Sequence, residues 1–403
     1  MTTKKDCGKK CIIPWMHLHT WPNKNVYPCC MGDMNESLVG SLANNSLEEI
    51  WNNDKMRELR VDMLNDVEND MCKRCWTQEN SGHPSLRNSF NENYEHLHHR
   101  WDQTQADGTT EYAPVYWDFR FSNICNMRCR SCGPQLSSGW YEDTKKRWGS
   151  LPQDVGDLTD RTPELWEQIE PLFETVEEIY FAGGEPLIME EHYRILNRLI
   201  EMGRTHVKLR YNSNMSRLRY KNLDIISAWQ HFENVEVGAS LDSWGERAEY
   251  IRKGTIWPDI EANMLRIRRE APHVRMYISA TVGIFNSLTL REYYTHMVNK
   301  GIIKPYEMWF NPIQEPPYLA VHNLPVAAKQ LLTEQWNDWA ADTHHSIKPQ
   351  LASLIKYMGS SEPQHLEKFL TETHAWDRIR GEQWRSVFPE LSRLIEVEQL
   401  AKH

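Results

Sequence analysis

The last two thirds of this 403-residue sequence contain no cysteine, since all nine of its cysteines lie at or before Cys132. Neither general packing nor a disulfide scaffold produces such a distribution. In a reducing compartment, clustered cysteines more often bind metal or carry out redox chemistry than form disulfides. We therefore look for metal sites in the first third of the chain.

Long apolar runs and an excess of positive charge are also missing. No apolar stretch reaches the roughly 18 residues that a membrane-spanning helix needs, and residues 1–10 have no signal-peptide core behind them. We therefore expect a cytoplasmic protein with no membrane partner. The net charge of -10 disfavours nucleic acid as a partner, because a phosphate backbone attracts a basic surface.

Short apolar runs alternate with helix-length amphipathic segments from Val115 onward, as is typical of parallel β/α units. Six strands are expected, at residues 115–121, 178–182, 207–211, 235–241, 274–282 and 307–310. Six strands with intervening helices predict an α/β fold, a partial (β/α)6 TIM-type barrel. We expect three domains: a small Cys-rich metal-binding module at 1–105, the barrel at 106–320 and a helical C-terminal extension at 321–403.

The Cys-rich module contains one clear helix signal. Ser46 and Glu49 form a capping-box pattern, after which Leu47, Ile50 and later apolar residues recur at helical spacing. Cys72 and Cys75 follow in a C-x-x-C segment that we expect to be a tight turn facing Cys11 and Cys29.

Three further cysteines, Cys125, Cys129 and Cys132, fall within eight residues directly after the first expected strand. A cubane 4Fe-4S cluster normally takes four cysteines. Three ligands therefore leave one iron open, as a substrate-binding cluster requires. A zinc knuckle that lacks a ligand, or chance cysteines in a turn, are the alternatives.

The C-x3-C-x2-C spacing resembles the signature of the radical S-adenosylmethionine (SAM) superfamily, and other elements follow in the order that the family shows. The resemblance implies that Gly183-Gly184-Glu185 after the second strand holds the amino group of SAM. It further implies a polar turn near SAM at Asn212, and contacts of Ser240, Asp242 and Arg252 with the SAM carboxylate and ribose. One departure is Ser131, where the superfamily often has an aromatic residue near the adenine.

The N-terminal module resembles the twitch or SPASM type of auxiliary-cluster domain, placed before the barrel as in the N-terminal-twitch branch of the superfamily. Four thiols, Cys11, Cys29, Cys72 and Cys75, are enough to saturate a second 4Fe-4S cluster or to close a zinc site. Cys30 is an alternative to Cys29, and Cys7 to Cys11. The remaining histidines, including His17, His19, His96, His98 and His99, are interpreted as surface or loop residues.

The resemblance implies that an external reductant of the flavodoxin or ferredoxin type reduces the cluster, and that SAM is then cleaved to a 5'-deoxyadenosyl radical. This radical would abstract hydrogen from a peptide or protein, with a small metabolite or a nucleotide as the alternative substrate. A non-catalytic electron-transfer protein with iron-sulfur clusters is the alternative of another class. No general base is identifiable, and the sequence does not indicate an oligomeric state.

Overall fold

The structure is a computed structural model that describes residues 7–32, 36–80, 84–152, 158 and 164–400. The chain divides into two compact units. Unit 1 comprises residues 1–123, 154–183 and 193–210, and unit 2 comprises residues 124–153, 184–192 and 211–403. Six of the nine cysteines belong to unit 1 and three to unit 2.

Unit 1 contains strands in the order β3-β2-β1-β4-β6. Their bounds are β1 His17–Thr20, β2 Asn25–Tyr27, β3 Gly40–Ser41, β4 Tyr116–Phe119 and β6 Glu178–Phe181. β1 is antiparallel to β2 but parallel to β4, with His17 opposite Tyr116 and His19 opposite Asp118. The Cys-rich segment therefore extends the sheet that β4 and β6 begin, instead of forming a sheet of its own.

The helices of unit 1 differ in part from expectation. The capping box of Ser46 and Glu49 is confirmed, but the helix it starts ends at Trp51, and Asn53 caps a second one. The C-x-x-C segment is helical instead of a tight turn, because a 3-10 helix at Asp70–Cys72 runs directly into α3. The bounds are α1 Leu47–Trp51, α2 Asp54–Leu64, α3 Lys73–Asn80, α4 Leu86–Asn93, α5 His99–Asp102 and α7 Leu165–Ile169.

Two elements have residues in both units: α8 (Glu190–Glu201) and β7 (Lys208–Ser213). In unit 2, the end of β7 is followed in the sheet by β10 (Val235–Ala239), β12 (Arg275–Val282) and β13 (Met308–Pro312). β10 pairs with β12, and β12 with β13, in parallel. Apolar side chains alternate along β12, where Met276, Ile278, Ala280 and Val282 are buried.

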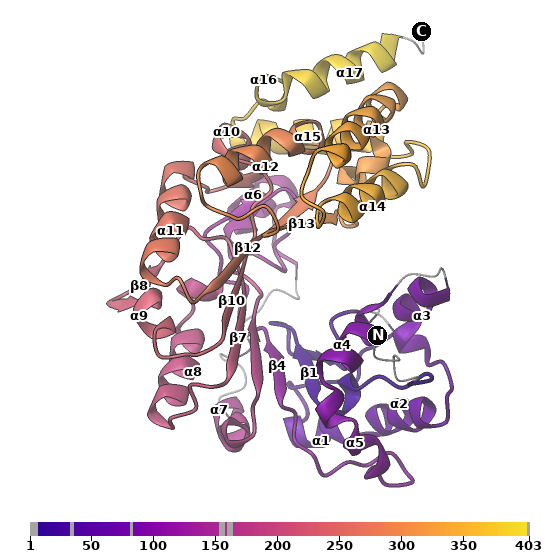
Figure 1. The fold of residues 1–403 in the computed structure, drawn as a ribbon, viewed down its shortest axis with the longest axis vertical. Coiled ribbons are helices and arrows are strands. Elements are labelled where there is room, and N and C mark those ends of the chain that lie inside the picture. Colours follow the sequence, from indigo (N-terminus) through magenta and orange to yellow (C-terminus); the bar gives the residue numbers. More distant parts are fainter. Residues whose placement is uncertain (1–6, 33–35, 81–83, 153–157, 159–163, 401–403) are drawn as a thin grey trace. The chain divides into compact units, whose positions relative to one another are not determined.

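All six expected strands are present: β4 and β6 in unit 1, β10, β12 and β13 in unit 2, and β7 with residues in both. The predicted α/β class is confirmed. Two short ladders, β5 (Arg128–Cys129) with β11 (Arg252–Lys253) and β8 (Arg219–Tyr220) with β9 (Leu223–Asp224), complete the strands of unit 2. Helices α9 and α11 lie along one side of β10 (Figure 1). The helices that accompany these strands are α6 Tyr141–Trp148, α9 Ile225–Trp229, α10 Gly245–Ile251, α11 Trp257–Glu270 and α12 Leu290–Asn299.

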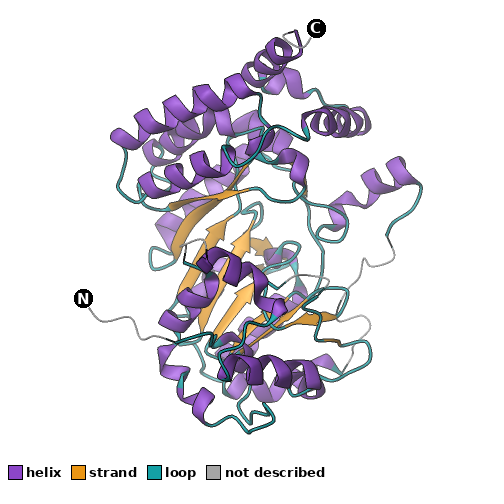
Figure 2. Cartoon of the chain, turned by 90° about the vertical axis from the view of Figure 1, so that its right-hand side faces the viewer, coloured by secondary structure: helices purple, strands orange, loops and turns teal. Residues whose placement is uncertain are grey.

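From residue 326 to residue 400 the described chain consists of helices and connecting loops, as Figure 2 shows near the C-terminus. These are α13 Val326–Ala341, α14 Lys348–Met358, α15 Leu366–Arg380, α16 Trp384–Val387 and α17 Pro389–Leu400. None of the helices in the described part of the chain has the length and apolar character of a membrane span.

Candidate functional site

The three cysteines of unit 2 lie on the loop that follows β4, and the short ladder β5–β11 fixes the middle one. Cys129 is on β5 directly opposite Arg252 on β11. The backbone N–H of Cys125 donates to Oγ of Ser138 (3.1 Å), and that of Cys132 donates to the carbonyl of Cys129 (3.0 Å). Hydrogen bonds of the backbone therefore set the course of this loop, including one from the N–H of Met127 to Sγ of Cys125 (3.4 Å).

Arg252 connects the middle cysteine to the end of β10. Its Nε lies 2.8 Å from one carboxylate oxygen of Asp242, and its Nη2 lies 3.1 Å from the other. Its remaining terminal nitrogen, Nη1, lies 3.6 Å from Sγ of Cys129. Asp242 also accepts from the backbone N–H of Thr281 (2.8 Å). This arrangement holds a guanidinium beside the cysteine, in a form suited to a carboxylate ligand.

Glu185, which follows the Gly183-Gly184 turn, is almost fully buried and binds the polar segment at the end of β7. Its carboxylate accepts from Oγ of Ser213 (2.8 Å) and from the backbone N–H groups of Asn214 (2.6 Å) and Leu187 (3.2 Å). Burial raises the pKa of Glu185 to about 7, although these hydrogen bonds lower it. The carboxylate thus holds the chain around it and is already occupied by three donors of the protein.

The polar turn after β7 reaches the cysteine loop through Asn214, the third residue of the Asn-Ser-Asn segment. The side-chain amide nitrogen of Asn214 lies 3.0 Å from Oδ1 of Asn126 and 3.9 Å from Sγ of Cys125. Asn212, two residues earlier on β7, is half-buried. Asn214 follows the end of that strand, and the sequence does not show which asparagine faces the loop.

Three further residues of the expected site, Ser240, Gly183 and Gly184, are described by their backbone. Ser240 is half-buried, and its N–H donates to the carbonyl of Ser213 (2.7 Å). Gly183 and Gly184 both have positive φ, at 83° and 52°, and the Glu185 N–H donates to the carbonyl of Ile124 (2.8 Å). The two glycines therefore make a backbone turn that other residues adopt only with strain.

A hollow of about 300 Å³ opens beside Ser131 and Asp242 in unit 2. Its walls are largely apolar, and most of them come from residues that the sequence does not single out. Besides Arg130, Ser131 and Asp242, the lining residues are Ile251, Thr281, Gly283, Ile284, Phe285, Asn286, Ile313 and Leu319. The aromatic group that Ser131 lacks has a counterpart here in Phe285, which no spacing rule in the sequence predicts.

The thiols of this loop titrate differently from one another. Burial raises the pKa of Cys125 to about 12. A hydrogen bond from Cys132, supported by the Arg252 guanidinium, lowers the pKa of Cys129 to about 7 against the effect of burial. Cys129 is therefore the thiol that most readily becomes a thiolate, the form that binds metal.

A second group of thiols lies in unit 1. Cys11, Cys29, Cys72 and Cys75 all line one hollow of about 470 Å³, whose other walls are mostly apolar. Burial raises the pKa of Cys72 to about 12 and that of Cys11 further still. Burial therefore disfavours the free thiolates of Cys11 and Cys72, and metal binding is what deprotonates such thiols.

The spacing of these four thiols fits a cubane better than a zinc ion. Tetrahedral zinc, with Zn–S bonds of about 2.3 Å, brings its sulfurs to about 3.8 Å from one another. In the described part of the chain the four thiols do not form a group with all ligand atoms within 4.8 Å. All four thiols line one hollow instead, and their number and type suit an iron-sulfur cluster.

The two alternative cysteines lie differently. Cys30 is exposed and is not among the residues that line the hollow, whereas the adjacent Cys29 is. Cys7 is half-buried against the same apolar core that includes Cys11, Leu59 and Phe90. Geometry therefore favours Cys29 over Cys30 and leaves Cys7 beside the site.

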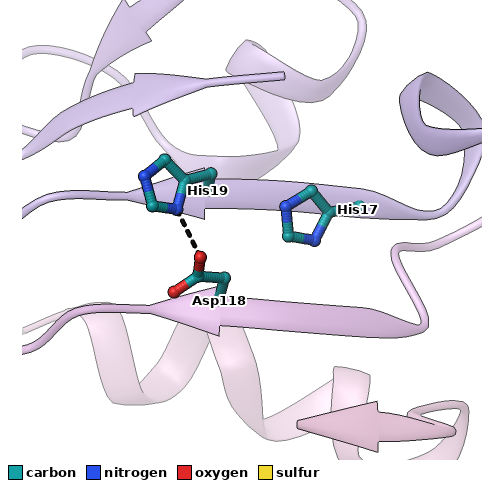
Figure 3. A group of neighbouring side chains, drawn as sticks. All are labelled: His17, His19 and Asp118. Carbon is teal, nitrogen blue, oxygen red and sulfur yellow. Dashed lines mark ion pairs between the residues drawn. The ribbon is translucent and has the colours of Figure 1, made fainter. Parts of the chain in front are cut away.

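His17 and His19 are buried on β1, which contradicts the expectation of surface or loop positions, whereas His98 is buried in a turn and His96 and His99 are exposed. Nδ1 of His19 lies 2.6 Å from the carboxylate of Asp118, and His17 lies along the same strand (Figure 3). Burial lowers the pKa of His17 to about 4, so it is neutral. Two histidines and an aspartate are residues that can ligate a metal ion. The Arg120 guanidinium already lies 3.3 Å from Asp118, however, and its charge would repel a metal ion at that carboxylate.

Two family models match the chain. Residues 119–285 match the radical SAM superfamily, and residues 11–76 match SPASM, an iron-sulfur cluster-binding domain. The first range contains the cysteine loop, Glu185 and Arg252, and the second contains all four thiols of unit 1. No curated protein matches the chain.

Solved structures show a weaker likeness. Native anSMEcpe with bound AdoMet is 18% identical over 55% of this chain and 59% of its own, with a TM-score of 0.38. SuiB of Streptococcus suis bound to S-adenosylmethionine is 11% identical over 71% of this chain and 62% of its own, at 0.35. The chain thus spans about three fifths of these proteins. TYW1 with a lysine-pyruvate adduct is 13% identical over 55% of this chain and 70% of its own, at 0.28.

Proposed function

Since the chain belongs to the radical SAM superfamily and carries a SPASM iron-sulfur domain in its first third, we propose that it cleaves S-adenosylmethionine and oxidises or modifies a peptide or protein. The reduced cluster supplies the electron that splits SAM into methionine and a 5'-deoxyadenosyl radical, which takes a hydrogen atom from the substrate. Residues 1–105, 106–320 and 321–403 are proposed to be the auxiliary-cluster module, the catalytic domain and a helical extension.

One observation carries this proposal: a loop with three cysteines, and no fourth within its unit, is surrounded by groups suited to an amino acid. Cys125, Cys129 and Cys132 are the proposed ligands of the SAM-binding cluster. Arg252, held by Asp242 at 2.8 Å, is proposed to bind the SAM carboxylate.

The other SAM contacts follow from the same surroundings. The backbone turn at Gly183-Gly184 and the Glu185 carboxylate are proposed to accept from the SAM amino group. Asn212 on β7 and Ser240 just after β10 are proposed as further polar contacts. The largely apolar hollow beside Ser131 is proposed to take the adenine, with Phe285 as the aromatic wall.

Cys11, Cys29, Cys72 and Cys75 are proposed to hold an auxiliary 4Fe-4S cluster with no open iron. Such a cluster orders the substrate side of the site or takes an electron from the product radical. The peptide substrate is proposed because auxiliary-cluster enzymes of this superfamily commonly act on peptides. A flavodoxin-like or ferredoxin-like protein is the proposed electron donor.

Anaerobic reconstitution with iron and sulfide, followed by dithionite and SAM, tests the chemistry. We expect 5'-deoxyadenosine, measured by liquid chromatography and mass spectrometry, and none from a variant in which Cys125, Cys129 and Cys132 are all alanine. Cys30→Ala is the matched control, because it removes an exposed thiol outside both proposed sites. A wild-type protein that holds its clusters but forms no 5'-deoxyadenosine would be an electron-transfer protein instead.

A further inference from the structure

Arg128 and Arg130, on either side of Cys129, both pair with carboxylates. Helix α15 of the C-terminal extension takes part in both ion-pair groups. Arg128 Nη1 lies 2.8 Å from Asp143, whose other oxygen lies 2.7 Å from Nε of Arg380 at the end of α15. Arg130 Nη2 lies 2.5 Å from Asp377, also on α15. The cysteine loop is therefore connected on both sides to residues about 250 positions later in the chain.

The contact of Arg130 is the more deeply buried one. Its side chain is 3% exposed, and its Nη2 also lies 2.7 Å from Glu382, which follows the end of α15. Lys253 on β11 lies 2.9 Å from the other oxygen of Glu382. Two positive and two negative charges thus balance one another beside Cys129 and Cys132.

Neutral groups fix this set of charges in place. The hydroxyl of Tyr250 donates to Asp377 (2.7 Å), and the Arg130 guanidinium lies 4.1 Å from the centre of the Tyr250 ring. The backbone N–H of Trp384 donates to the other oxygen of Asp377 (2.8 Å). The backbone N–H of Arg130 in turn donates to the carbonyl of Ile251 (2.8 Å), just before β11. These contacts fix Asp377 and the backbone of Arg130, and the guanidinium reaches both carboxylates through Nη2.

We infer that Arg130, Asp377 and Glu382 are positioning residues through which the C-terminal extension holds the cluster loop and sets the reduction potential of its cluster. Reduction adds a negative charge to the cluster, and potentials of iron-sulfur clusters depend on the net charge around them. Arg130 is the residue next to Cys129, its side chain is buried, and a buried charge acts through a low dielectric. The region that matches the superfamily model ends at residue 285, so this control comes from a part of the chain outside that match.

If these charges act on the cluster, removing a negative or a positive one shifts its reduction potential in opposite directions. Loss of a merely structural contact has no such dependence on the sign of the charge. Asp377→Asn or Glu382→Gln leaves a net positive charge, which favours the reduced cluster and raises its potential. Arg130→Gln leaves a net negative charge and lowers the potential. We expect each change to alter the ratio of reduced to oxidised cluster at fixed potential about tenfold, or about 59 mV for one electron.

The experiment is an anaerobic redox titration of the reconstituted full chain, followed by electron paramagnetic resonance. The signal that changes shape when SAM is added identifies the cluster of Cys125, Cys129 and Cys132. Glu372→Gln is the matched control, because Glu372 lies on the same α15 but pairs with Arg147 (2.8 Å) outside the loop. It should leave the potential unchanged.

Shifts of opposite sign, with the control unmoved, support the inference; shifts of one sign, or none, overturn it. If Arg130→Gln fails to bind iron, Arg130→Lys keeps the charge and should keep the wild-type potential, and a shifted potential in that variant would also overturn the inference. The inference rests on the proposed cluster ligands. A wild-type chain that forms 5'-deoxyadenosine while its variants show no signed shift would disprove this inference alone.

Discussion

Arg252 lies between Asp242 and Cys129, with its Nε 2.8 Å from the carboxylate of the first and its Nη1 3.6 Å from Sγ of the second. The residues come from the end of β10, from β11 and from β5, and the antiparallel pairing of Arg252 with Cys129 sets their distance. The carboxylate therefore fixes a cation beside a proposed cluster ligand.

Asp242→Asn should weaken SAM use. It removes the charge that orients Arg252, and a hydrogen bond to a charged group contributes about 1.5–3 kcal/mol. We expect kcat/KM for SAM to fall about 10-fold to 100-fold, measured as 5'-deoxyadenosine formed at increasing SAM concentration. Asp224→Asn is the control, since Asp224 pairs with Arg219 and Arg266 (3.0 and 2.8 Å) away from the cysteine loop. An equal loss in both variants would contradict the proposed role.

Iron content should separate the two metal sites. A variant with alanine at Cys125, Cys129 and Cys132 should keep about four irons, because four thiolates remain at the hollow of unit 1. Cys72→Ala with Cys75→Ala should lose those irons and keep the SAM-dependent signal of the other cluster. Elemental analysis after anaerobic reconstitution measures both, with Cys30→Ala as the control. One zinc and no iron in the first variant would show a structural zinc site instead.

Glu185 should make SAM binding depend on pH. Burial raises its pKa to about 7, so the carboxylate is mostly protonated at pH 6 and mostly ionised at pH 8. If the ionised form accepts from the SAM amino group, affinity follows the ionised fraction and rises about tenfold over this range.

Glu185→Gln provides the comparison, because it retains any titration of SAM itself but not that of the carboxylate. Equilibrium binding of SAM to the reconstituted protein, measured between pH 6 and 8, should show the rise in the wild type and a flatter profile in the variant. Parallel profiles would mean that Glu185 only supports the backbone of Asn214 and Leu187.

Gly183→Ala should destabilise the protein more than Gly203→Ala. Both glycines have positive φ, so each substitution costs about 1 kcal/mol in backbone strain. A Cβ at Gly183 would also lie 2.9 Å from Cβ of Arg120, whereas a Cβ at Gly203 would meet nothing within 4 Å. We expect the free energy of unfolding to fall by at least about 1 kcal/mol more at Gly183. Equal losses in anaerobic denaturant titrations would show that Arg120 moves aside without cost.

The sequence predicts well what depends on local pattern. Strand positions at 178–182 and 274–282 were expected within a residue or two of β6 and β12, because buried parallel strands are continuous apolar or alternating runs. The Ser46 cap was also correct, since a capping box uses residues only three positions apart. The break at Asn52–Asn53 was missed because helical spacing of the apolar residues continues across it.

Contacts between distant residues were the part that pattern could not supply. His17 and His19 read as loop residues, yet pairing of β1 with β4 buries them beside Asp118, about 100 positions later. Phe285 in the hollow and Asn214 at Cys125 were overlooked for the same reason.

By itself, the sequence determined which metal chemistry this protein can carry, since the type, number and spacing of thiols within a short loop decide how many ligands a cluster has. Only the tertiary structure decided which charges surround those thiols. Arg130 shows no sign of its partners in the sequence, because Asp377 on α15 and Glu382 just after that helix follow about 250 residues later. Electrostatic surroundings depend on distance in space, and folding alone brings such residues within a few ångströms.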